Sequence, residues 1–189
     1  VVSIGSGLGR ENETLKAVLE ILNKFPDKKF VIDADAVFAL KNNNYKKINL
    51  EEKILTPHHK EFADLLGISL YDLEKDLMYY GKKFAENTSS YLVLKGSPTI
   101  IFNPFGEAFI NTTGNPGMAK FGSGDVLTGV IASFVAQSQE IEQSLIAAVY
   151  LHSLSADLLF EEKTEYGITA TAIMENMPDA IKFIINSFV

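Results

Sequence analysis

The chain has 189 residues, of which 47% are hydrophobic and 22% are charged, a composition that fits one globular α/β domain with a sizeable core. Its formal net charge of -7 disfavours a nucleic-acid partner, and no cluster of Lys and Arg offsets that charge. Because the chain has no cysteine, it has no disulfide, thiolate nucleophile or Cys-based zinc site. No apolar run reaches the length that spans a membrane, so we expect no membrane partner.

The first segment predicts a strand, a glycine-rich turn and a helix. Residues 1–4 form a β-rich apolar run, and Gly5-Ser6-Gly7-Leu8-Gly9-Arg10 follows. The helix after it has an apolar stripe at Leu15, Val18, Leu19 and Leu22. The third glycine comes too early for G-x-G-x-x-G, so the turn is either a phosphate-binding turn or a plain βα turn. Since the chain starts directly in a strand, we expect further residues upstream of Val1.

Polar side chains follow the next two predicted strands. Residues 29–33 form a short buried strand, and the carboxylates Asp33 and Asp35 stand at its end. Residues 41–50 are polar and predicted to be solvated. Residues 53–56 form another strand, which leads through Pro57 into a helix that begins near His58. Carboxyl ends of parallel strands line the crevice where ligands bind in open sheets. Asp33 is therefore either a site residue or a loop cap.

Residues 58–61, His-His-Lys-Glu, stand at a helix start. They either cap the first turn or contact a ligand, and a helix start favours a neutral imidazole. The spacing H-x-x-x-H is absent, so we reject zinc.

Residues 70–86 predict one amphipathic helix, and a β-turn-β unit follows it. Its strands are residues 90–94 and 100–103, and the tight turn between them is Lys95-Gly96-Ser97-Pro98-Thr99. Lys95 is either a solvated hairpin lysine or a mobile positive charge for a phosphate. Residues 107–111 predict one more strand.

Residues 111–136, NTTGNPGMAKFGSGDVLTGVIASFVA, carry the most chemical information. A glycine-rich loop runs into a buried helix that begins near Ser123 to Val126, which leaves backbone N–H groups free for an anion. Asp125 is either a capping carboxylate or a base beside a phosphate. The segment is not a P-loop, because the Lys and Ser/Thr of that motif are missing.

Two helical stretches end the chain. Residues 140–160 predict a helix whose broad apolar face contains His152, which we interpret as a core histidine with satisfied hydrogen bonds. Residues 167–171 precede the last helical stretch, and Thr171 is the expected cap.

The string GNPGMAKFGSGDVLTG resembles the signature of the ADP/ATP-dependent NAD(P)H-hydrate dehydratases, a branch of the ribokinase-like superfamily. GSGLGR, VIDADA, TPHHKEF and LKGSPT resemble further motifs of that branch and occur in matching order. The resemblance implies one ribokinase-like domain over residues 1–189, built as a three-layer α/β/α sandwich with a mostly parallel sheet. It also implies that the first strands of the fold are missing, which would leave an exposed sheet edge.

The resemblance implies a function in cofactor repair. The expected reaction is dehydration of the S epimer of NADHX or NADPHX to NADH or NADPH, with ADP or ATP as co-substrate and Mg²⁺ as cofactor. The expected products from the nucleotide are AMP or ADP, and phosphate. A cytoplasmic location, a homo-oligomer such as a tetramer, and a fused or associated epimerase domain are implied by the same likeness.

The resemblance also implies roles for individual residues. Asp125 is the expected catalytic base, and Gly7, His58 and Asp125 are expected to bind NADPHX. The residues expected to bind the nucleotide are Lys95, Gly96, Ser97, Pro98, Thr99, Gly122, Ser123 and Gly124. Glu61 and Asp33 are expected in the network around metal and phosphate, and no residue is assigned as a direct metal ligand.

Two other functions remain open at this point. A ribokinase-like kinase for a vitamin or heterocyclic alcohol would use the same Asp125 and anion site but release a phosphorylated product. His58, where such kinases have Asn, and the long glycine-rich loop favour the dehydratase. A non-catalytic nucleotide-binding module is the other alternative, which Ser6 in place of the family's Pro and the pair Lys120-Phe121 leave open.

Overall fold

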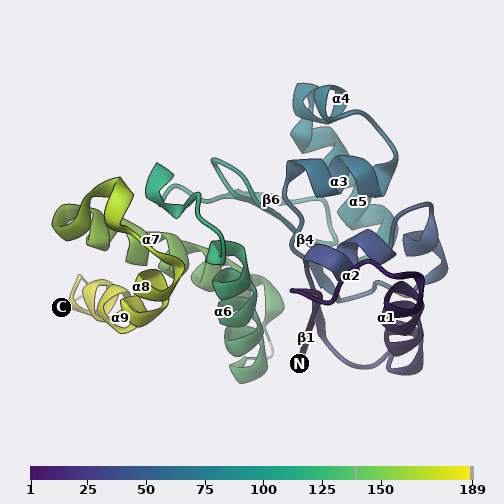
Figure 1. The fold of residues 1–189 in the computed structure, drawn as a ribbon, viewed down its shortest axis with the longest axis horizontal. Coiled ribbons are helices and arrows are strands. Elements are labelled where there is room, and N and C mark those ends of the chain that lie inside the picture. The colour runs from purple at the N-terminus through teal and green to yellow at the C-terminus, as the bar shows by residue number, and fades with distance from the viewer. Residues whose placement is uncertain (139, 188–189) are drawn as a thin grey trace. The chain divides into compact units, whose positions relative to one another are not determined.

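The computed structural model describes residues 1–138 and 140–187. Contacts between Cα atoms divide the chain into two compact units, Val1–Ile110 and Asn111–Val189. In Figure 1 the first unit runs from purple to teal and the second from teal-green to yellow. The prediction of one domain over residues 1–189 stays a prediction.

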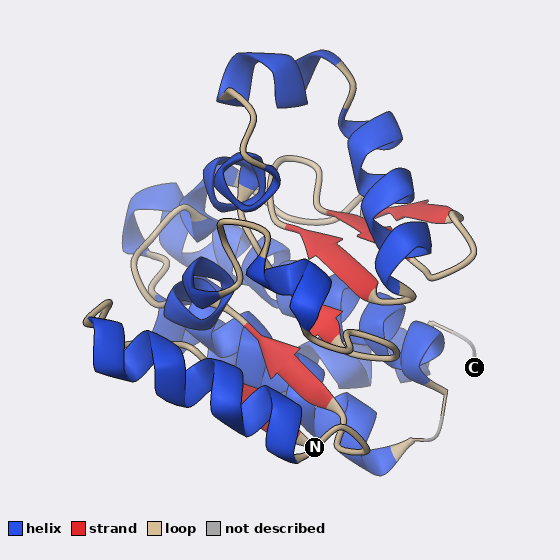
Figure 2. Ribbon diagram, turned by 90° about the vertical axis from the view of Figure 1, so that its right-hand side faces the viewer, coloured by secondary structure: helices blue, strands red, loops and turns tan. Residues whose placement is uncertain are grey.

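The first unit contains a six-stranded sheet whose strands follow one another in chain order, drawn in red in Figure 2. The strands are β1 (Val2–Ile4), β2 (Phe30–Ile32), β3 (Ile54–Leu55), β4 (Tyr91–Leu94), β5 (Ile100–Phe102) and β6 (Ala108–Ile110). The pairs from β1 to β4 are parallel, and the pairs β4–β5 and β5–β6 are antiparallel. This order confirms the predicted α/β class, with a largely parallel sheet and one antiparallel hairpin region.

Helices follow the parallel strands, as crossover connections require. They are α1 (Asn12–Lys24), α2 (Ala34–Ala39), α3 (His59–Leu66), α4 (Leu70–Lys75) and α5 (Leu77–Thr88), with the 3₁₀ turn η1 (Asn44–Lys47). Their apolar faces form one buried cluster with alternate strand residues, among them Phe30 and Ile32 of β2 and Leu92 and Leu94 of β4. This period of two shows that one face of the sheet packs on these helices.

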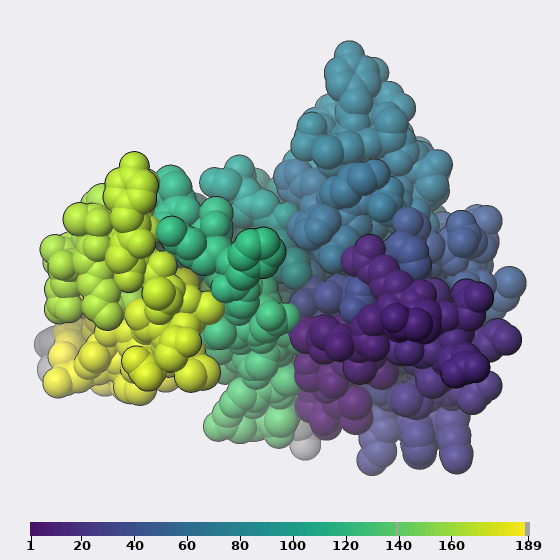
Figure 3. Space-filling view, viewed as in Figure 1, coloured from purple at the N-terminus to yellow at the C-terminus, as the bar shows by residue number. Residues whose placement is uncertain are grey.

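Two details of this unit differ from the prediction. Residues 70–86 form two helices, because Asp76 has a non-helical backbone (φ -153°, ψ 69°) and its side chain accepts a hydrogen bond from Tyr79 N, which starts α5. Around α4 the chain projects from the surface of the unit (Figure 3). The segment 41–50 is not fully solvated, since Ile48 and Leu50 are 8% and 2% exposed.

The second unit is helical in the part that the structure describes. It contains η2 (Pro116–Met118), α6 (Ser123–Gln137), α7 (Ile141–Gly167), α8 (Ala170–Glu175) and α9 (Met177–Asn186). The long α7 contacts each of the other four elements. The predicted cap Thr171 is wrong, because Thr169 accepts from Ala172 N at 3.1 Å and caps α8 two residues earlier.

Among the described residues, α7 is the one helix long and apolar enough to cross a membrane. In this structure 61% of its most apolar window is buried inside the protein. A core helix passes the same test, so we interpret α7 as the central helix of the second unit.

Candidate functional site

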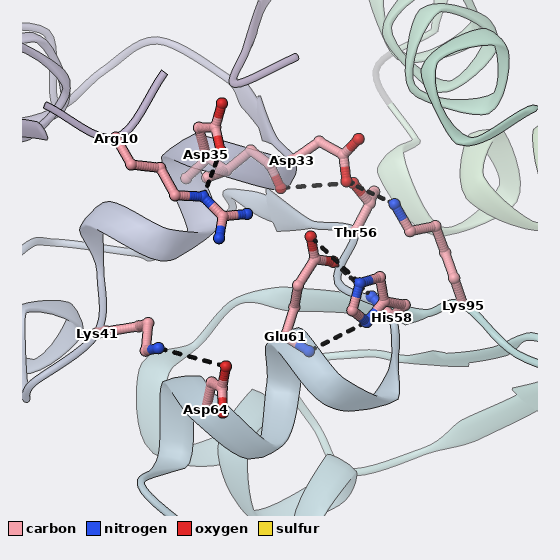
Figure 4. A network of polar contacts seen from close by, with 10 residues as sticks. Arg10, Asp33, Asp35, Lys41, Thr56, His58, Glu61, Asp64 and Lys95 are labelled. Carbon is pink, nitrogen blue, oxygen red and sulfur yellow. Dashed lines mark hydrogen bonds and ion pairs between the residues drawn. The ribbon is translucent and has the colours of Figure 1, made fainter. Parts of the chain in front are cut away.

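Polar and glycine-rich segments gather where the parallel strands of the first unit end. β1 runs into the turn of residues 5–9, β2 into Asp33, β3 into residues 56–58, and β4 into Lys95. Lys95 N donates a hydrogen bond to Pro57 O at 2.9 Å, which extends the pairing of β3 and β4 beyond the strands. These segments therefore share one edge of the sheet (Figure 4).

Asp33 is the centre of a buried polar network at this edge. Its Oδ1 accepts from Lys95 Nζ at 2.7 Å and from Thr56 Oγ1 at 2.8 Å. The Asp33 side chain is 3% exposed and that of Lys95 is 20% exposed. The network joins the ends of β2, β3 and β4, so Lys95 is a tethered cation rather than a solvated hairpin lysine.

The glycine-rich turn after β1 is fastened to α2 by a second carboxylate. Asp35 accepts from Gly9 N at 2.9 Å and from Arg10 Nε at 2.7 Å. The hydrogen bond from the Arg10 guanidinium holds the pKa of Asp35 below its usual value. Gly7 has φ +68° and is exposed, and no atom lies within 4 Å of where its Cβ would be. The turn thus presents bare backbone to an approaching ligand.

His58 and Glu61 form a capping box at the start of α3. Glu61 N donates to His58 Nδ1 at 3.1 Å, and His58 N donates to Glu61 Oε2 at 2.9 Å. Because Nδ1 accepts, it carries no proton in this arrangement, and the proton of a neutral ring is on Nε2. The capping interpretation of this segment is confirmed, and the His58 side chain remains 53% exposed.

The turn of residues 95–99 packs tightly on His59. A Cβ on Gly96 would lie 2.5 Å from His59 Nε2. This nitrogen is buried and has no hydrogen-bond partner among the described residues. Thr99 Oγ1 donates to Gly96 O at 3.2 Å, and the Ser97–Pro98 peptide bond is cis.

In the second unit, the glycine loop ends in a helix start without a capping side chain. Gly122 is the N-cap of α6 with φ +88°, and Asp125 is exposed in the first turn. Ser123 N donates to Lys120 O at 3.3 Å, so this amide is already engaged. The remaining first-turn amides and the helix dipole suit an anion. Phe121, just before Gly122, is fully exposed.

His152 lies in the core, as predicted, with 3% of its surface exposed. Burial lowers its pKa to about 4, while a hydrogen bond to the Ser123 backbone opposes that shift. The prediction of satisfied hydrogen bonds is wrong at one atom, because Nε2 has no partner among the described residues. His152 therefore supports the first turn of α6 as a neutral ring.

The structure brings Asp33, His58, Glu61 and Lys95 to one edge of the first unit, while Gly122 to Asp125 belong to the second unit. Sequence reasoning missed the partners that hold these segments: Arg10, Thr56, His59 and Asp157. Thr56 and His59 lie within the motif TPHHKEF, and Arg10 ends the motif GSGLGR. Asp157 gave no local signal, since its partners are 42 and 43 residues away.

No group of three or more His, Asp or Glu side chains in the described ranges is arranged to hold a metal ion. Asp33 Oδ1 and Glu61 Oε2 are both engaged within the protein. This donor set fits Mg²⁺ that binds through nucleotide phosphates and water, since that ion often takes only one or two protein carboxylates.

The mixed sheet, its polar strand ends and the glycine-rich helix start define a ribokinase-like α/β protein. The sequence model of the NAD(P)H-hydrate dehydratase family matches residues 1–179. The chain belongs to this family.

Two curated relatives illustrate the match. The bifunctional NAD(P)H-hydrate repair enzyme of Thermofilum pendens is 34% identical over 189 residues, which are 100% of this chain and 36% of that protein. The ADP-dependent (S)-NAD(P)H-hydrate dehydratase of Neisseria meningitidis is 33% identical over 187 residues, which are 97% of this chain and 62% of that protein. The chain thus spans less than two thirds of the length of either relative.

Solved structures of family members share the fold of this chain. The ADP/ATP-dependent NAD(P)H-hydrate dehydratase of Bacillus subtilis, co-crystallised with ATP and Mg²⁺, matches with a TM-score of 0.83 and 31% identity, over 96% of this chain and 63% of that chain. Hydroxyethylthiazole kinase of Pyrococcus horikoshii matches with a TM-score of 0.71 at 16% identity, over 96% of this chain and 70% of that chain. This second match shows a shared fold alone.

Proposed function

We propose that this chain carries out ADP- or ATP-dependent dehydration of the S epimer of NADHX and NADPHX, which regenerates NADH and NADPH. The observation that carries the proposal is the start of α6, where an exposed Asp125 lies in the first turn of a helix capped by the bare backbone of Gly122. Phosphoryl transfer to a hydroxyl needs a site for the phosphate and a base for the hydroxyl proton, and a helix start with an acid beside it can provide both.

In this proposal the nucleotide binds through the turn of residues 95–99 and through Gly122, Ser123 and Gly124. Gly7, His58 and Asp125 bind the hydrated nicotinamide nucleotide. Support comes from the tethered ammonium group of Lys95 and the exposed backbone at Gly7, because both suit charged phosphate groups. The protonated Nε2 of a neutral His58 provides a hydrogen-bond donor for a substrate amide or hydroxyl.

The reaction then proceeds in two steps. Asp125 takes the proton of the ring hydroxyl while that oxygen attacks the terminal phosphorus, which forms a phosphorylated hydrate and releases AMP from ADP or ADP from ATP. The ring nitrogen next pushes electrons toward the carbon that bears the phosphate, the C–O bond breaks, and the neighbouring ring carbon loses a proton. The products are the reduced nicotinamide and phosphate.

When the nucleotide brings Mg²⁺, this ion would supply positive charge to the phosphoryl oxygens, and Glu61 and Asp33 would hold it through water. The backbone amides at the start of α6 stabilise the same charge from the protein side. Water has to be excluded while the nucleotide is bound, because hydrolysis of the nucleotide competes with transfer.

The relatives also suggest an assembly for this chain. The name of the Thermofilum pendens relative describes a bifunctional repair enzyme, so we propose an epimerase domain fused to this chain or associated with it. A homo-oligomer such as a tetramer and a cytoplasmic location belong to the same proposal. Neither nucleic acid nor a membrane is a proposed partner.

The direct test mixes purified protein with S-NADHX and ADP and follows the absorbance of reduced nicotinamide together with the release of AMP and phosphate. The proposal predicts that NADH, AMP and phosphate form in equal amounts, and that R-NADHX is inert until an epimerase is added. ATP in place of ADP measures nucleotide preference.

A stable phosphorylated product from an alcohol, with no gain in reduced nicotinamide, would identify a kinase instead. Nucleotide binding without turnover of any hydrate or alcohol would identify a non-catalytic module. Either result would overturn the proposed dehydratase activity.

A further inference from the structure

One carboxylate of α7 holds the glycine loop that precedes α6. Asp157 Oδ2 accepts from Gly114 N at 2.7 Å, and Asp157 Oδ1 accepts from Asn115 Nδ2 at 2.9 Å. Both oxygens of the carboxylate are therefore used on two consecutive residues of the loop. Hydrogen bonds to an ionised acceptor are among the stronger ones in proteins.

Asn115 in turn holds the next residues of the loop. Its Oδ1 accepts from Gly117 N at 3.0 Å, which caps the 3₁₀ turn η2. The two bonds fix the orientation of the amide, with nitrogen toward Asp157 and oxygen toward Gly117. A Cβ on Gly117 would lie 2.8 Å from Asn115 Oδ1, so this turn requires glycine for the close approach.

The start of the loop is fastened to the same face of α7. Thr113 Oγ1 donates to Tyr150 O at 3.2 Å, and Asn111 Nδ2 donates to Ser153 Oγ at 3.1 Å. Together with Asp157, these α7 residues follow a spacing of three and then four, which places them on one side of the helix. Residues 111–117 are thus held along α7 before the chain reaches Gly122 and Asp125.

We infer that Asp157 is a positioning residue, which through Asn115 holds the glycine loop in the conformation that presents the amides of α6 to a phosphate. This inference rests on the proposed function for its catalytic consequence, but not for its structural one. Asp157 contacts neither substrate nor nucleotide in this role. A loop fixed before the ligand arrives avoids ordering entropy during binding, which is the basis of a pre-organised anion site.

The chemistry of the pair provides a reciprocal test. D157N keeps one acceptor oxygen but presents an NH₂ group to a donor, and N115D places two carboxylates against each other. The exchange variant N115D/D157N restores complementarity: the amide of residue 157 accepts from Gly114 N and donates to the carboxylate of residue 115, which still accepts from Gly117 N. The exchange also leaves net charge unchanged. E161Q, which removes an exposed carboxylate from the same helix, is the matched control.

Amide hydrogen exchange of residues 114–125 is measured in the ligand-free protein, alongside kcat and KM for ADP with S-NADHX. Losing a charge-assisted hydrogen bond corresponds to a change of about 10- to 100-fold in local opening, so the loop amides of D157N and N115D should exchange faster by that factor. We expect kcat/KM for ADP to fall by a similar factor. The exchange variant should return both readouts to within about threefold of wild type, a range that corresponds to less than one kcal/mol.

Unchanged exchange in D157N, or an exchange variant no better than D157N alone, would overturn the inference. Equal effects of E161Q and D157N would do the same. If wild-type protein has no dehydratase activity, the proposed function fails, while the exchange rates still decide the role of Asp157.

Discussion

Lys95 Nζ lies 2.7 Å from Asp33 Oδ1, although the two residues are 62 positions apart in the chain. The ion pair connects the end of β2 to the end of β4, and the carboxylate also accepts from Thr56. Asp33 therefore sets the position of Lys95 at the start of the proposed nucleotide-binding turn. The expected place of Asp33 in the network around metal and phosphate stays a prediction.

Replacing Asp33 should affect stability and nucleotide binding together. D33N removes a charge from a side chain that is 3% exposed and leaves the Lys95 ammonium without its carboxylate. Breaking a buried ion pair by removing one partner costs roughly 3 kcal/mol, and we expect that loss in urea unfolding together with a higher KM for ADP.

Asp64 offers the matched control, because it pairs with Lys41 and Lys60 at the surface, with its own side chain 32% exposed. D64N should cost less than about 1 kcal/mol, as expected of an exposed pair. Equal losses from the two variants would contradict the central place given to Asp33.

Gly96 and His59 form a second coupled pair. In G96A the new Cβ would meet His59 Nε2 at 2.5 Å, so either the turn or the imidazole has to move. We expect the KM for ADP to rise by about tenfold, equivalent to 1.4 kcal/mol, with little change in melting temperature. The double variant G96A/H59A makes room for the methyl group and should recover most of the affinity.

Gly129 on α6 is the control for the glycine substitution itself, since no atom lies within 4 Å of its Cβ position. G129A should be neutral or stabilise the helix by up to about 1 kcal/mol. If H59A failed to relieve G96A, the steric explanation for the turn would be wrong.

His152 makes stability depend on pH. Burial lowers its pKa from 6.5 to about 4, so between these values the unfolded chain binds more protons than the folded one. Stability is therefore fully present above pH 6.5 and falls as the pH drops toward 4, by at most about 3 kcal/mol.

The variant H152Q has no titrating group at this position, so its unfolding free energy should lose less between neutral pH and mildly acidic pH. Urea unfolding at a series of pH values measures the difference in slope. Identical slopes for wild type and H152Q would show that His152 does not titrate with a lowered pKa.

Local patterns predicted the sheet well. Short apolar runs marked all six strands. The glycine-rich loop followed by helical spacing predicted a helix start near Ser123 to Val126, and α6 begins at Ser123. Each of these patterns lies within one continuous segment of the chain. The break at Asp76 was not visible in the apolar spacing, because both α4 and α5 continue an amphipathic pattern and only the backbone of one residue interrupts it.

For the candidate site too, local motifs were informative and long-range contacts were not. Motifs indicated Asp33, His58, Lys95 and Asp125, but not how they are held. The partners of Asp33 and Asp157 come from strands and helices that are distant in sequence, and a single sequence contains no signal for such pairs. The roles of the individual site residues stay predictions.

Asp125 is the residue on which the proposed activity depends, and D125N tests it most directly. The asparagine preserves size and hydrogen bonding at the start of α6 but cannot accept the proton of the attacking hydroxyl. Calorimetric titration with ADP and turnover of S-NADHX are measured on the same preparation. We predict ADP affinity close to that of wild type and turnover lower by about 10²- to 10⁴-fold. Turnover of S-NADHX near the wild-type rate would contradict it.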